Sequence, residues 1–211
     1  MRKAEIIVII IILVSIAVGI YLYPKMPERI ASHWNAQGKV DGYMSKFWGL
    51  FIMPIISIGL FLFFIAIPRI DPLKTNIEKF RGYFDTFIVL FFAFLFYLYL
   101  LTIFWNIGLR FGMIQLLSPA FGILFYYGGI LIENAKRNWF IGIRTPWTLS
   151  SDTVWEKTHK VGARLFKIVA VICLFGIFFP RSAIFFVLIP IILVVIYTII
   201  YSYVKYQRET K

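Results

Sequence analysis

The sequence contains few of the residues from which metal sites and catalytic centres are built. It has one cysteine, Cys173, and two histidines, His33 and His159. A lone cysteine within an apolar run excludes a disulfide framework and a cysteine-based zinc site. Two histidines so far apart exclude the H-E-x-x-H pair of metalloproteases, and there is no G-x-S-x-G nucleophile elbow. We therefore predict no metal, no cofactor and no enzyme activity.

Acidic residues are also scarce, with 10 Asp and Glu against 22 Lys and Arg and a formal net charge of +12. Such a charge is compatible with nucleic-acid binding when the basic residues form a stripe or an arm. Here they stand singly between apolar runs. We interpret them as signals of membrane topology and predict no direct contact with nucleic acid.

Long hydrophobic runs are abundant. Hydrophobic residues make up 61% of the chain and its mean hydropathy is +0.84, well above the range of soluble domains. The runs approach the ~20 residues that cross a bilayer as a helix. The first lacks an A-x-A-like cleavage site, so we interpret it as an anchor. The predicted fold is all-α, with six transmembrane helices at residues 5–23, 47–67, 83–105, 113–132, 164–179 and 183–204.

Lys and Arg predict the orientation, because cytoplasmic loops carry the excess. With the N-terminus inside, sixteen of the 22 basic residues lie on the inner side. Both termini are then cytoplasmic in a multi-pass plasma-membrane protein, the 24–46 loop is outside and the 133–163 loop is cytoplasmic. We expect one membrane domain, with a two-helix unit at 1–82 and a four-helix unit at 83–211. The six outer basic residues are Lys25, Arg29, Lys39, Lys46, Arg110 and Arg181.

The predicted spans have no ionisable residue near their centres. Asp85, Glu133 and Lys167 lie at span ends, and coupled transporters usually need such groups at mid-membrane. Ion transport is therefore disfavoured. Pro54 and Pro119 fall inside spans, as does Pro190, and each is expected to kink its helix.

The outer loop gathers polar and aromatic residues between glycines that permit turns. Gly38 and Gly42 are expected to bring His33, Trp34, Asn35 and Asp41 together near the outer surface. This cluster could bind a peptide or a metal. The alternative is a cap at the membrane interface, with Trp34 at the headgroup level and with Asp41 and Ser45 satisfying helix ends.

The inner loop contains the segment N-W-F-I-G-I-R-T-P-W-T-L-S-S-D, which starts at Asn138. Gly142 permits a bend, and Thr145 precedes Pro146, which favours extended geometry. Arg144, held among indoles, suits either a structural cation–π contact or the recognition of a carboxylate, a phosphate or a lipid headgroup. Both interpretations stay open.

A short helix is predicted from Asp152 to about Val161, with Ser150 or Ser151 as its N-cap. Asp152, Glu156 and His159 would share one face of it. Glu-x-x-His is half of a di-metal motif, but the sequence has no second copy. A Ser nucleophile with His159 as its base is the remaining enzyme alternative.

Two motifs resemble those of the SdpI-like immunity family, and together with the six spans they cover the whole chain. The outer loop is similar to H-[FW]-N-x-x-G-x-x-D-x-x-x-S-K, and the inner loop is similar to a G-[IL]-R-T-P-W-T core followed by an acidic residue and V-W. The outer matching positions are His33, Trp34, Asn35, Gly38, Asp41, Ser45 and Lys46. The inner ones are Asn138, Gly142, Arg144, Thr145, Pro146, Trp147, Thr148, Asp152, Trp155 and His159.

This resemblance implies a membrane protein that protects the cell from a secreted peptide toxin, with a cytoplasmic repressor as a second partner and the lipid bilayer as its surroundings. We hypothesise a non-catalytic mechanism, in which the toxin or another amphipathic ligand engages the outer loop and adjacent spans and kinked helices pass a small shift to the cytoplasmic loop. Pro54, Pro119 and the Arg144 turn are the parts expected to move or lock. The rivals are a small transporter or flippase for peptide or lipid, and a cytoplasmic-face enzyme using Ser151, Glu156 and His159.

Overall fold

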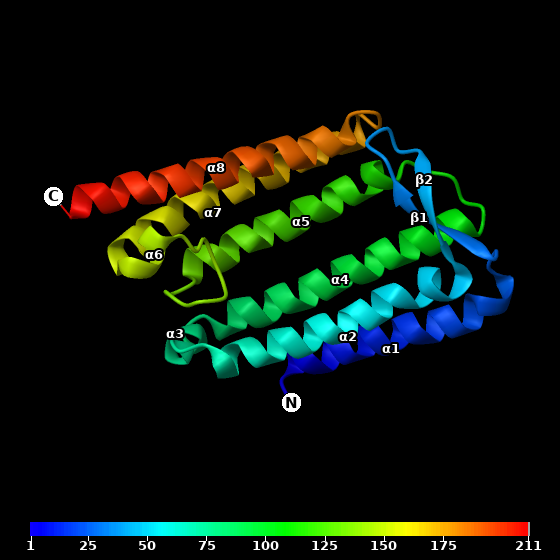
Figure 1. Ribbon diagram of the computed structural model, residues 1–211, viewed down its shortest axis with the longest axis horizontal. Coiled ribbons are helices and arrows are strands. Elements are labelled where there is room, and N and C mark those ends of the chain that lie inside the picture. The colour runs from blue at the N-terminus through cyan, green and yellow to red at the C-terminus, as the bar shows by residue number, and fades with distance from the viewer. Residues whose placement is uncertain (211) are drawn as a thin grey trace.

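Six long helices make up most of the molecule (Figure 1). The computed structural model describes residues 1–210. The long helices are α1 (Lys3–Leu22), α2 (Lys46–Ile70), α4 (Arg81–Asn106), α5 (Met113–Asn134), α7 (Asp152–Leu174) and α8 (Ala183–Glu209). The short elements are η1 (Tyr23–Lys25), β1 (Arg29–Trp34), β2 (Val40–Ser45), α3 (Lys74–Glu78), α6 (Pro146–Ser150) and η2 (Phe175–Ile177).

Five of these helices are long and apolar enough to cross a membrane: α1, α2, α4, α5 and α8. Their outward faces carry exposed apolar side chains such as Leu62, Ile123 and Leu193, each about 60% exposed, as expected where lipid replaces water. α7 is not among the five, because charged residues from Asp152 to Lys167 interrupt its apolar character. A membrane protein built of helices is thus confirmed, while the sixth crossing stays a prediction.

The expectation of an all-α chain is wrong between residues 29 and 45. β1 and β2 pair antiparallel there, with Ile30 opposite Met44 and Ala31 opposite Tyr43. The register shifts between Ala31 and Trp34. The sequence signal was weak because neither strand has a clean alternation of apolar and polar residues.

The predicted break between a short helix and a span at 164–179 is also wrong. α7 runs without interruption from Asp152 to Leu174 and continues into the single turn of η2. No proline falls within it, and its glycine, Gly162, packs closely on Ile143. One continuous helix therefore joins the inner motif to the apolar segment that follows.

The long helices pack in two groups of three that meet along α4 and α5 (Figure 1). Aromatic side chains fill the core of α1, α2 and α4, where the Phe64 ring lies 6.0 Å from that of Phe84 and 6.1 Å from that of Phe92. In the second group α5 and α7 approach closely at Gly122 and Gly129, where a Cβ would lie 2.9 Å and 2.8 Å from backbone carbonyls of α7. Small residues allow such close contact between membrane helices.

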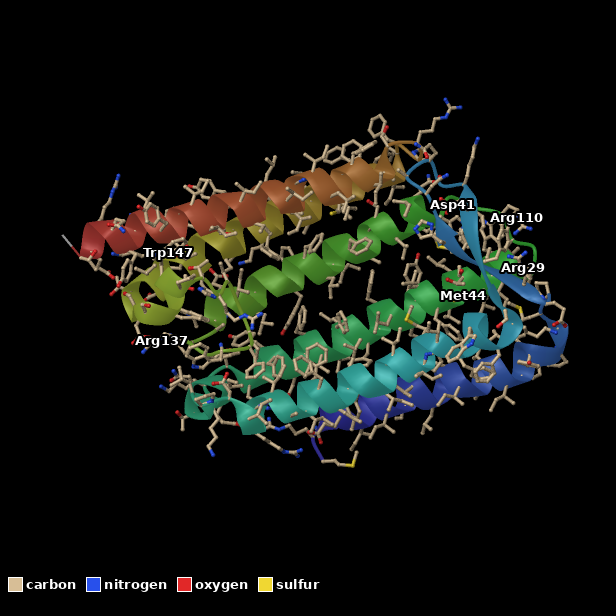
Figure 2. All side chains as sticks on the ribbon, viewed as in Figure 1. Arg29, Asp41, Met44, Arg110, Arg137 and Trp147 are labelled. Carbon is tan, nitrogen blue, oxygen red and sulfur yellow. The ribbon has the colours of Figure 1, made fainter. Side chains whose placement is uncertain are left out.

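The connections separate into two ends. The hairpin, the 107–112 connection and the 178–182 connection lie at one end, and both termini, α3 and α6 lie at the other (Figure 1). Figure 2 shows Asp41 and Arg110 at the first end and Arg137 and Trp147 at the second. We call these the hairpin end and the terminal end.

Candidate functional site

The two sequence motifs fold at opposite ends of the bundle (Figure 2). The long helices that separate them have 20 to 27 residues, which corresponds to roughly 30 to 40 Å at 1.5 Å per residue. No single pocket can therefore contain residues of both motifs. His33 and His159 in particular cannot act on one ligand.

Asn35 and Gly38 form the turn of the hairpin. The Asn35 side-chain oxygen accepts hydrogen bonds from the backbone N–H groups of Gln37 and Lys39, both at 3.0 Å. Gly38 has a φ of +75°, which favours glycine. These two motif residues therefore shape the loop, and the side-chain oxygen of Asn35 is used within it.

His33 and Asp41 face each other across the two strands. The His33 Nδ1 and the Asp41 carboxylate are 2.5 Å apart, and both side chains are well exposed. Gly42 lies opposite His33, and a Cβ at Gly42 would lie 2.8 Å from the His33 Cβ. The predicted closeness of His33 and Asp41 is confirmed.

Trp34 turns away from His33 and into the ends of α4 and α5. Its ring meets that of Trp105 edge to face at 5.6 Å, beside Leu101 and Met113. This contact anchors the hairpin on the helices. It does not place Trp34 with His33 and Asp41.

Ser45 and Lys46 join the hairpin to α2. Ser45 occupies the N-cap position without a side-chain hydrogen bond, so the expected cap contact is not made. The Lys46 ammonium donates to the Glu28 carboxylate at 2.6 Å, and its side chain is largely buried. Lys46 therefore closes the base of the hairpin.

Asn106, at the end of α4, is a residue that the sequence analysis missed. Its side-chain oxygen accepts from the Ala31 N–H at 2.8 Å, and its amide donates to the Ala31 carbonyl at 3.0 Å. Asn106 therefore occupies the outer edge of β1. The two residues are 75 positions apart, and no local pattern could have paired them.

Asn138 organises the inner loop from its interior. It is fully buried, its amide donates to the carbonyls of Lys136 and Ile141, and its oxygen accepts from the N–H groups of Phe140 and Ile141. All four bonds lie between 2.6 and 2.9 Å. Because every polar group of the side chain is used within the loop, Asn138 acts on its shape.

Arg144 donates to the backbone carbonyl of Trp139 at 2.7 Å and is exposed. Within residues 1–210 its guanidinium is not stacked on an indole. The cation–π contact expected for Arg144 is therefore not made, and its structural contact is the hydrogen bond to the Trp139 carbonyl. Trp147 instead packs edge to face on Tyr203 of α8, with ring centres 5.0 Å apart.

Thr145, Pro146 and Thr148 begin the short helix α6. The Thr145 hydroxyl accepts from the Thr148 N–H at 3.2 Å, and Pro146 occupies the first helical position, where its missing N–H has no consequence. Thr148 is fully buried and donates to the carbonyl of Ile143. The Thr145 hydroxyl also donates to Ser202 of α8 at 3.0 Å. These contacts tie the motif to the last helix.

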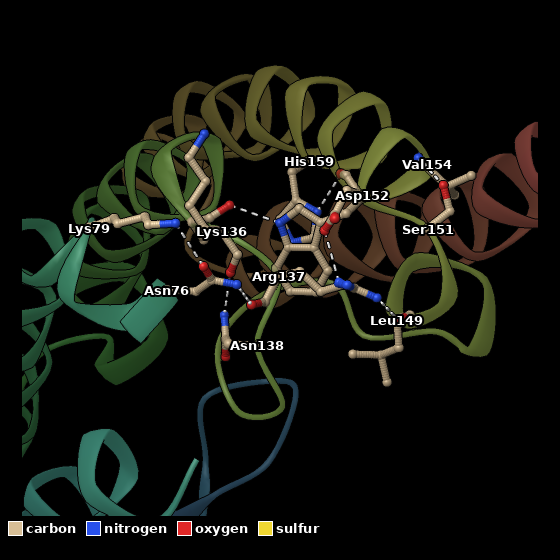
Figure 3. Close-up of polar contacts among 12 residues, drawn as sticks. Asn76, Lys79, Lys136, Arg137, Asn138, Leu149, Ser151, Asp152, Val154 and His159 are labelled. Atoms are coloured by element: carbon tan, nitrogen blue, oxygen red, sulfur yellow. Dashed lines mark hydrogen bonds and ion pairs between the residues drawn. The ribbon is translucent and has the colours of Figure 1, made fainter. Parts of the chain in front are cut away.

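The N-terminus of α7 is capped by Ser151, one of the two residues proposed from the sequence. Its hydroxyl accepts from the Val154 N–H at 3.2 Å and donates to Glu209 at 2.6 Å. Asp152 pairs with Arg137 at 2.8 Å, and Arg137 also donates to the Leu149 carbonyl (Figure 3). Arg137, which is not a motif residue, therefore connects the start of α7 to the end of α6 and stabilises this loop.

Trp155 and His159 form the buried centre of the inner motif. Their rings stack 4.0 Å apart, and the Trp155 indole N–H donates to the Ala135 carbonyl. The His159 Nδ1 donates to the Trp155 carbonyl at 2.8 Å, and its Nε2 accepts from the Ile143 N–H at 3.0 Å. Gly142 has a φ of +120°, and a Cβ there would overlap the His159 ring. This explains why the bend requires glycine.

These contacts determine the chemistry available to His159. Its two partners, a carbonyl and an N–H, fix the neutral ring with the proton on Nδ1. Burial lowers the pKa of His159 to about 4, although the hydrogen bond to Trp155 opposes the shift. With both nitrogens occupied, the ring has no free lone pair for a proton from Ser151 or for a metal ion. Within residues 1–210 no group of three potential ligands is suited to a metal.

Comparison with known proteins decides the family. Residues 134–202 match the SdpI/YfhL protein family, and residues 10–58 match a domain of unknown function (DUF1648). The chain is 31% identical over 213 residues to Immunity protein SdpI of Bacillus subtilis (strain 168), covering 99% of this chain and 97% of that protein. The chain belongs to the SdpI/YfhL family. No solved structure matches it.

The two family matches correspond to the two folded motifs. The segment 10–58 spans most of α1, the hairpin and the first half of α2, and the segment 134–202 spans the inner loop, α7 and most of α8. The SdpI/YfhL match thus coincides with the terminal-end structure built around Asn138 and His159. The similar Bacillus protein is named for immunity and not for an enzyme activity.

Proposed function

We propose that this protein is a six-crossing plasma-membrane protein that protects its cell from a secreted peptide toxin without catalysis. The observation that supports this most is its similarity, over nearly the whole chain, to a protein named for immunity. The occupied nitrogens of His159 and the engaged hydroxyl of Ser151 argue against the enzyme alternative.

We place both termini and the inner motif in the cytoplasm and the hairpin outside. The distribution of Lys and Arg supports this orientation. The grouping of connections at two ends supports a common side for both termini and the inner motif (Figure 1). α7 would make the sixth crossing with its apolar second half. Single cysteines at Gln37 and Ser150, both exposed, in a Cys173→Ser background test it with an impermeant maleimide. Labelling of Gln37→Cys alone in intact cells is expected, and equal labelling of both would contradict the topology.

The hairpin offers a strand edge to an extended peptide. Asn106 binds the N–H and carbonyl of Ala31, which therefore point away from β2. Tyr43 is the direct partner of Ala31, so in an antiparallel pair its own N–H and carbonyl point away from β1. β2 has no second neighbour within residues 1–210. An unpaired edge of this kind binds peptides by strand addition.

Exposed apolar side chains adjoin that edge. Tyr43 is 52% exposed, Met44 36%, Phe47 48% and Trp48 51%. In the proposed orientation they lie at the outer membrane surface, where an amphipathic peptide concentrates. We therefore propose that the toxin pairs with β2 while its apolar side chains contact Tyr43, Phe47 and Trp48.

Survival of a toxin-sensitive host that expresses the protein tests the proposed function, with a vector-only strain as the reference. Tyr43→Pro removes the outward N–H, and proline is tolerated at an edge, so we expect loss of protection at unchanged protein level. The matched variant Tyr43→Phe keeps both the N–H and the aromatic ring and should retain protection. Death of the wild-type strain would refute the immunity function, whereas protection by Tyr43→Pro would refute only the strand-addition mechanism.

We also propose that a cytoplasmic repressor binds the terminal end, as the family resemblance implies. Trp139 supports this: it is 51% exposed on a loop whose backbone is fixed by Asp71 at 2.9 Å and by Arg144. Trp139→Ala should release the repressor and leave protection intact. Unchanged repressor recruitment to the membrane would contradict this surface.

A further inference from the structure

A polar cleft opens at the terminal end between α3, the end of α5 and the first half of α7. Its volume is about 370 Å³, within the range of small-ligand sites and too small for a folded partner. Asn76, Lys79 and Lys136 line it together with Trp155 and the residues around His159. Figure 3 shows Asn76, Lys79 and Lys136 near His159.

The charges of the cleft do not balance. Each of its three carboxylates already has a basic partner: Asp152 pairs with Arg137, Glu156 with Lys160 and Glu133 with Lys167. Lys79 and Lys136 have no carboxylate partner within residues 1–210, and Lys79 donates only to the Asn76 side chain, at 3.0 Å. The pKa of Glu156 is lowered, first by the hydrogen bond and charge of Lys160 and then also by the charge of Lys136. The cleft thus presents two uncompensated positive charges, which favour an anion.

An apolar groove of about 280 Å³ runs along the same face of α5 and α7. On α7, Lys160 lines the cleft and Val171 and Leu174 line the groove, and their spacings of 11 and 14 residues keep them on one face of the helix. On α5, Glu133 and Tyr126 are related in the same way by 7 residues. The groove and the cleft therefore lie one after the other on the same face of the α5–α7 pair.

The dimensions match one leaflet of a bilayer. Ten residues of α7 separate Lys160 in the cleft from Ala170 in the groove, or roughly 15 Å at 1.5 Å per residue. Half of the ~30 Å hydrocarbon core has the same thickness. The Lys167–Glu133 ion pair, at 2.5 Å, lies on the side of the cleft that faces the groove, since Glu133 lines the cleft and Lys167 lies between Lys160 and Ala170 on α7.

We propose that cleft and groove form one binding site for an anionic phospholipid, with the phosphate headgroup between Lys79 and Lys136 and an acyl chain in the groove. The apolar groove alone would accept any lipid, and the two unpaired lysines select the negative headgroup. Basic pockets between membrane helices are used in this way for anionic lipids. The site is distinct from the hairpin end, and its test involves no toxin, so it can fail without affecting the proposed function.

Native mass spectrometry of the purified protein, exchanged with phosphatidylglycerol or with phosphatidylcholine, tests the headgroup. A lysine near an anionic surface contributes roughly a fivefold affinity, so Lys79→Gln with Lys136→Gln should weaken retention of phosphatidylglycerol about thirtyfold. The control pair, Lys74→Gln with Lys205→Gln, removes the same charge at the same end but outside the cleft. It should retain the lipid as the wild type does.

A second pair of variants tests the groove. Val171→Trp fills it, whereas Ile168→Trp adds the same ring beside it on α7. The two parent side chains are equally exposed, at 55%, so both variants should fold, as gel filtration will verify. Only Val171→Trp should lose the lipid. Equal retention by all variants, equal retention of phosphatidylcholine, or binding of inorganic phosphate without lipid would each overturn the proposal.

Discussion

Acid should destabilise the protein through His159. The ordinary pKa of 6.5 falls to about 4 in the folded chain because the ring is buried, although its hydrogen bond to the Trp155 carbonyl opposes the shift. Between these values the unfolded chain binds a proton that the folded chain does not, so stability decreases as the pH falls. The full shift corresponds to about 3 kcal/mol, of which about 2.5 kcal/mol is lost by pH 4.5.

Thermal unfolding of the detergent-solubilised protein between pH 7.5 and 4.5 measures this loss. On the scale of soluble chains of this length, about 2.5 kcal/mol corresponds to a decrease in Tm of roughly 5 to 10 °C. His159→Gln carries no titrating group at this position. Its Tm should therefore decrease between pH 7.5 and 4.5 by roughly 5 to 10 °C less than the Tm of the wild type. His33→Gln is the control, because His33 is exposed. Identical pH profiles for the wild type and His159→Gln would refute the reasoning.

Two further predictions concern glycine and asparagine. Gly142→Ala should destabilise the protein by more than the about 1 kcal/mol that a positive φ costs, since a Cβ would overlap His159. Gly108→Ala, with a φ of +111° and open space around it, should cost only the backbone term, so equal decreases in Tm would contradict this explanation. Asn106→Leu should free Ala31 and speed amide hydrogen exchange in β1, with no change in the inner loop. Unaltered exchange at Ala31 would show that Asn106 does not hold the strand.

The helices were predictable because their sequences leave few alternatives. Runs of about 20 apolar residues fold as helices in a bilayer. The structure has helices over five of the six predicted segments and over most of the segment 164–179, where α7 ends at Leu174 and η2 at Ile177. The boundaries were less certain, as the charged first half of α7 shows. The sequence predicts a separate short helix from Asp152 to about Val161, but α7 continues beyond it, with Gly162 packed on Ile143 and Gly129 of α5 packed on Ala163.

The hairpin was not predictable from local patterns. Its strands are short, and two of its supports, Asn106 and the ring of Trp105, come from α4, about 70 residues further along the chain. Arg137 and Ser202 were not predicted for the same reason. The contact of Arg137 with Leu149 and that of Ser202 with Thr145 depend on how the inner loop folds. The motif residues indicate which loops have a defined structure or function. The direction in which each of their side chains points depends on contacts with residues far away in the sequence.

His159 shows why motif membership does not identify a binding residue. Its spacing from Asp152 and Glu156 suggested a polar face with an available imidazole. However, the Trp155 ring and Gly142 cover the imidazole, and the Trp155 carbonyl and the Ile143 N–H occupy its two nitrogens. Asn138 likewise uses its amide and its oxygen within its own loop, and Asn35 uses its side-chain oxygen within the hairpin turn.

Most residues of the two motifs therefore determine how two loops fold, the hairpin at one end of the helical bundle and the inner loop at the other. We call these two folded loops the caps. Contacts with other molecules must then come from side chains that the caps leave exposed. We propose that at the hairpin end these include Tyr43 and Trp48, which lie outside the motif positions near the exposed His33 and Asp41, and at the terminal end Trp139 and the lysines of the cleft.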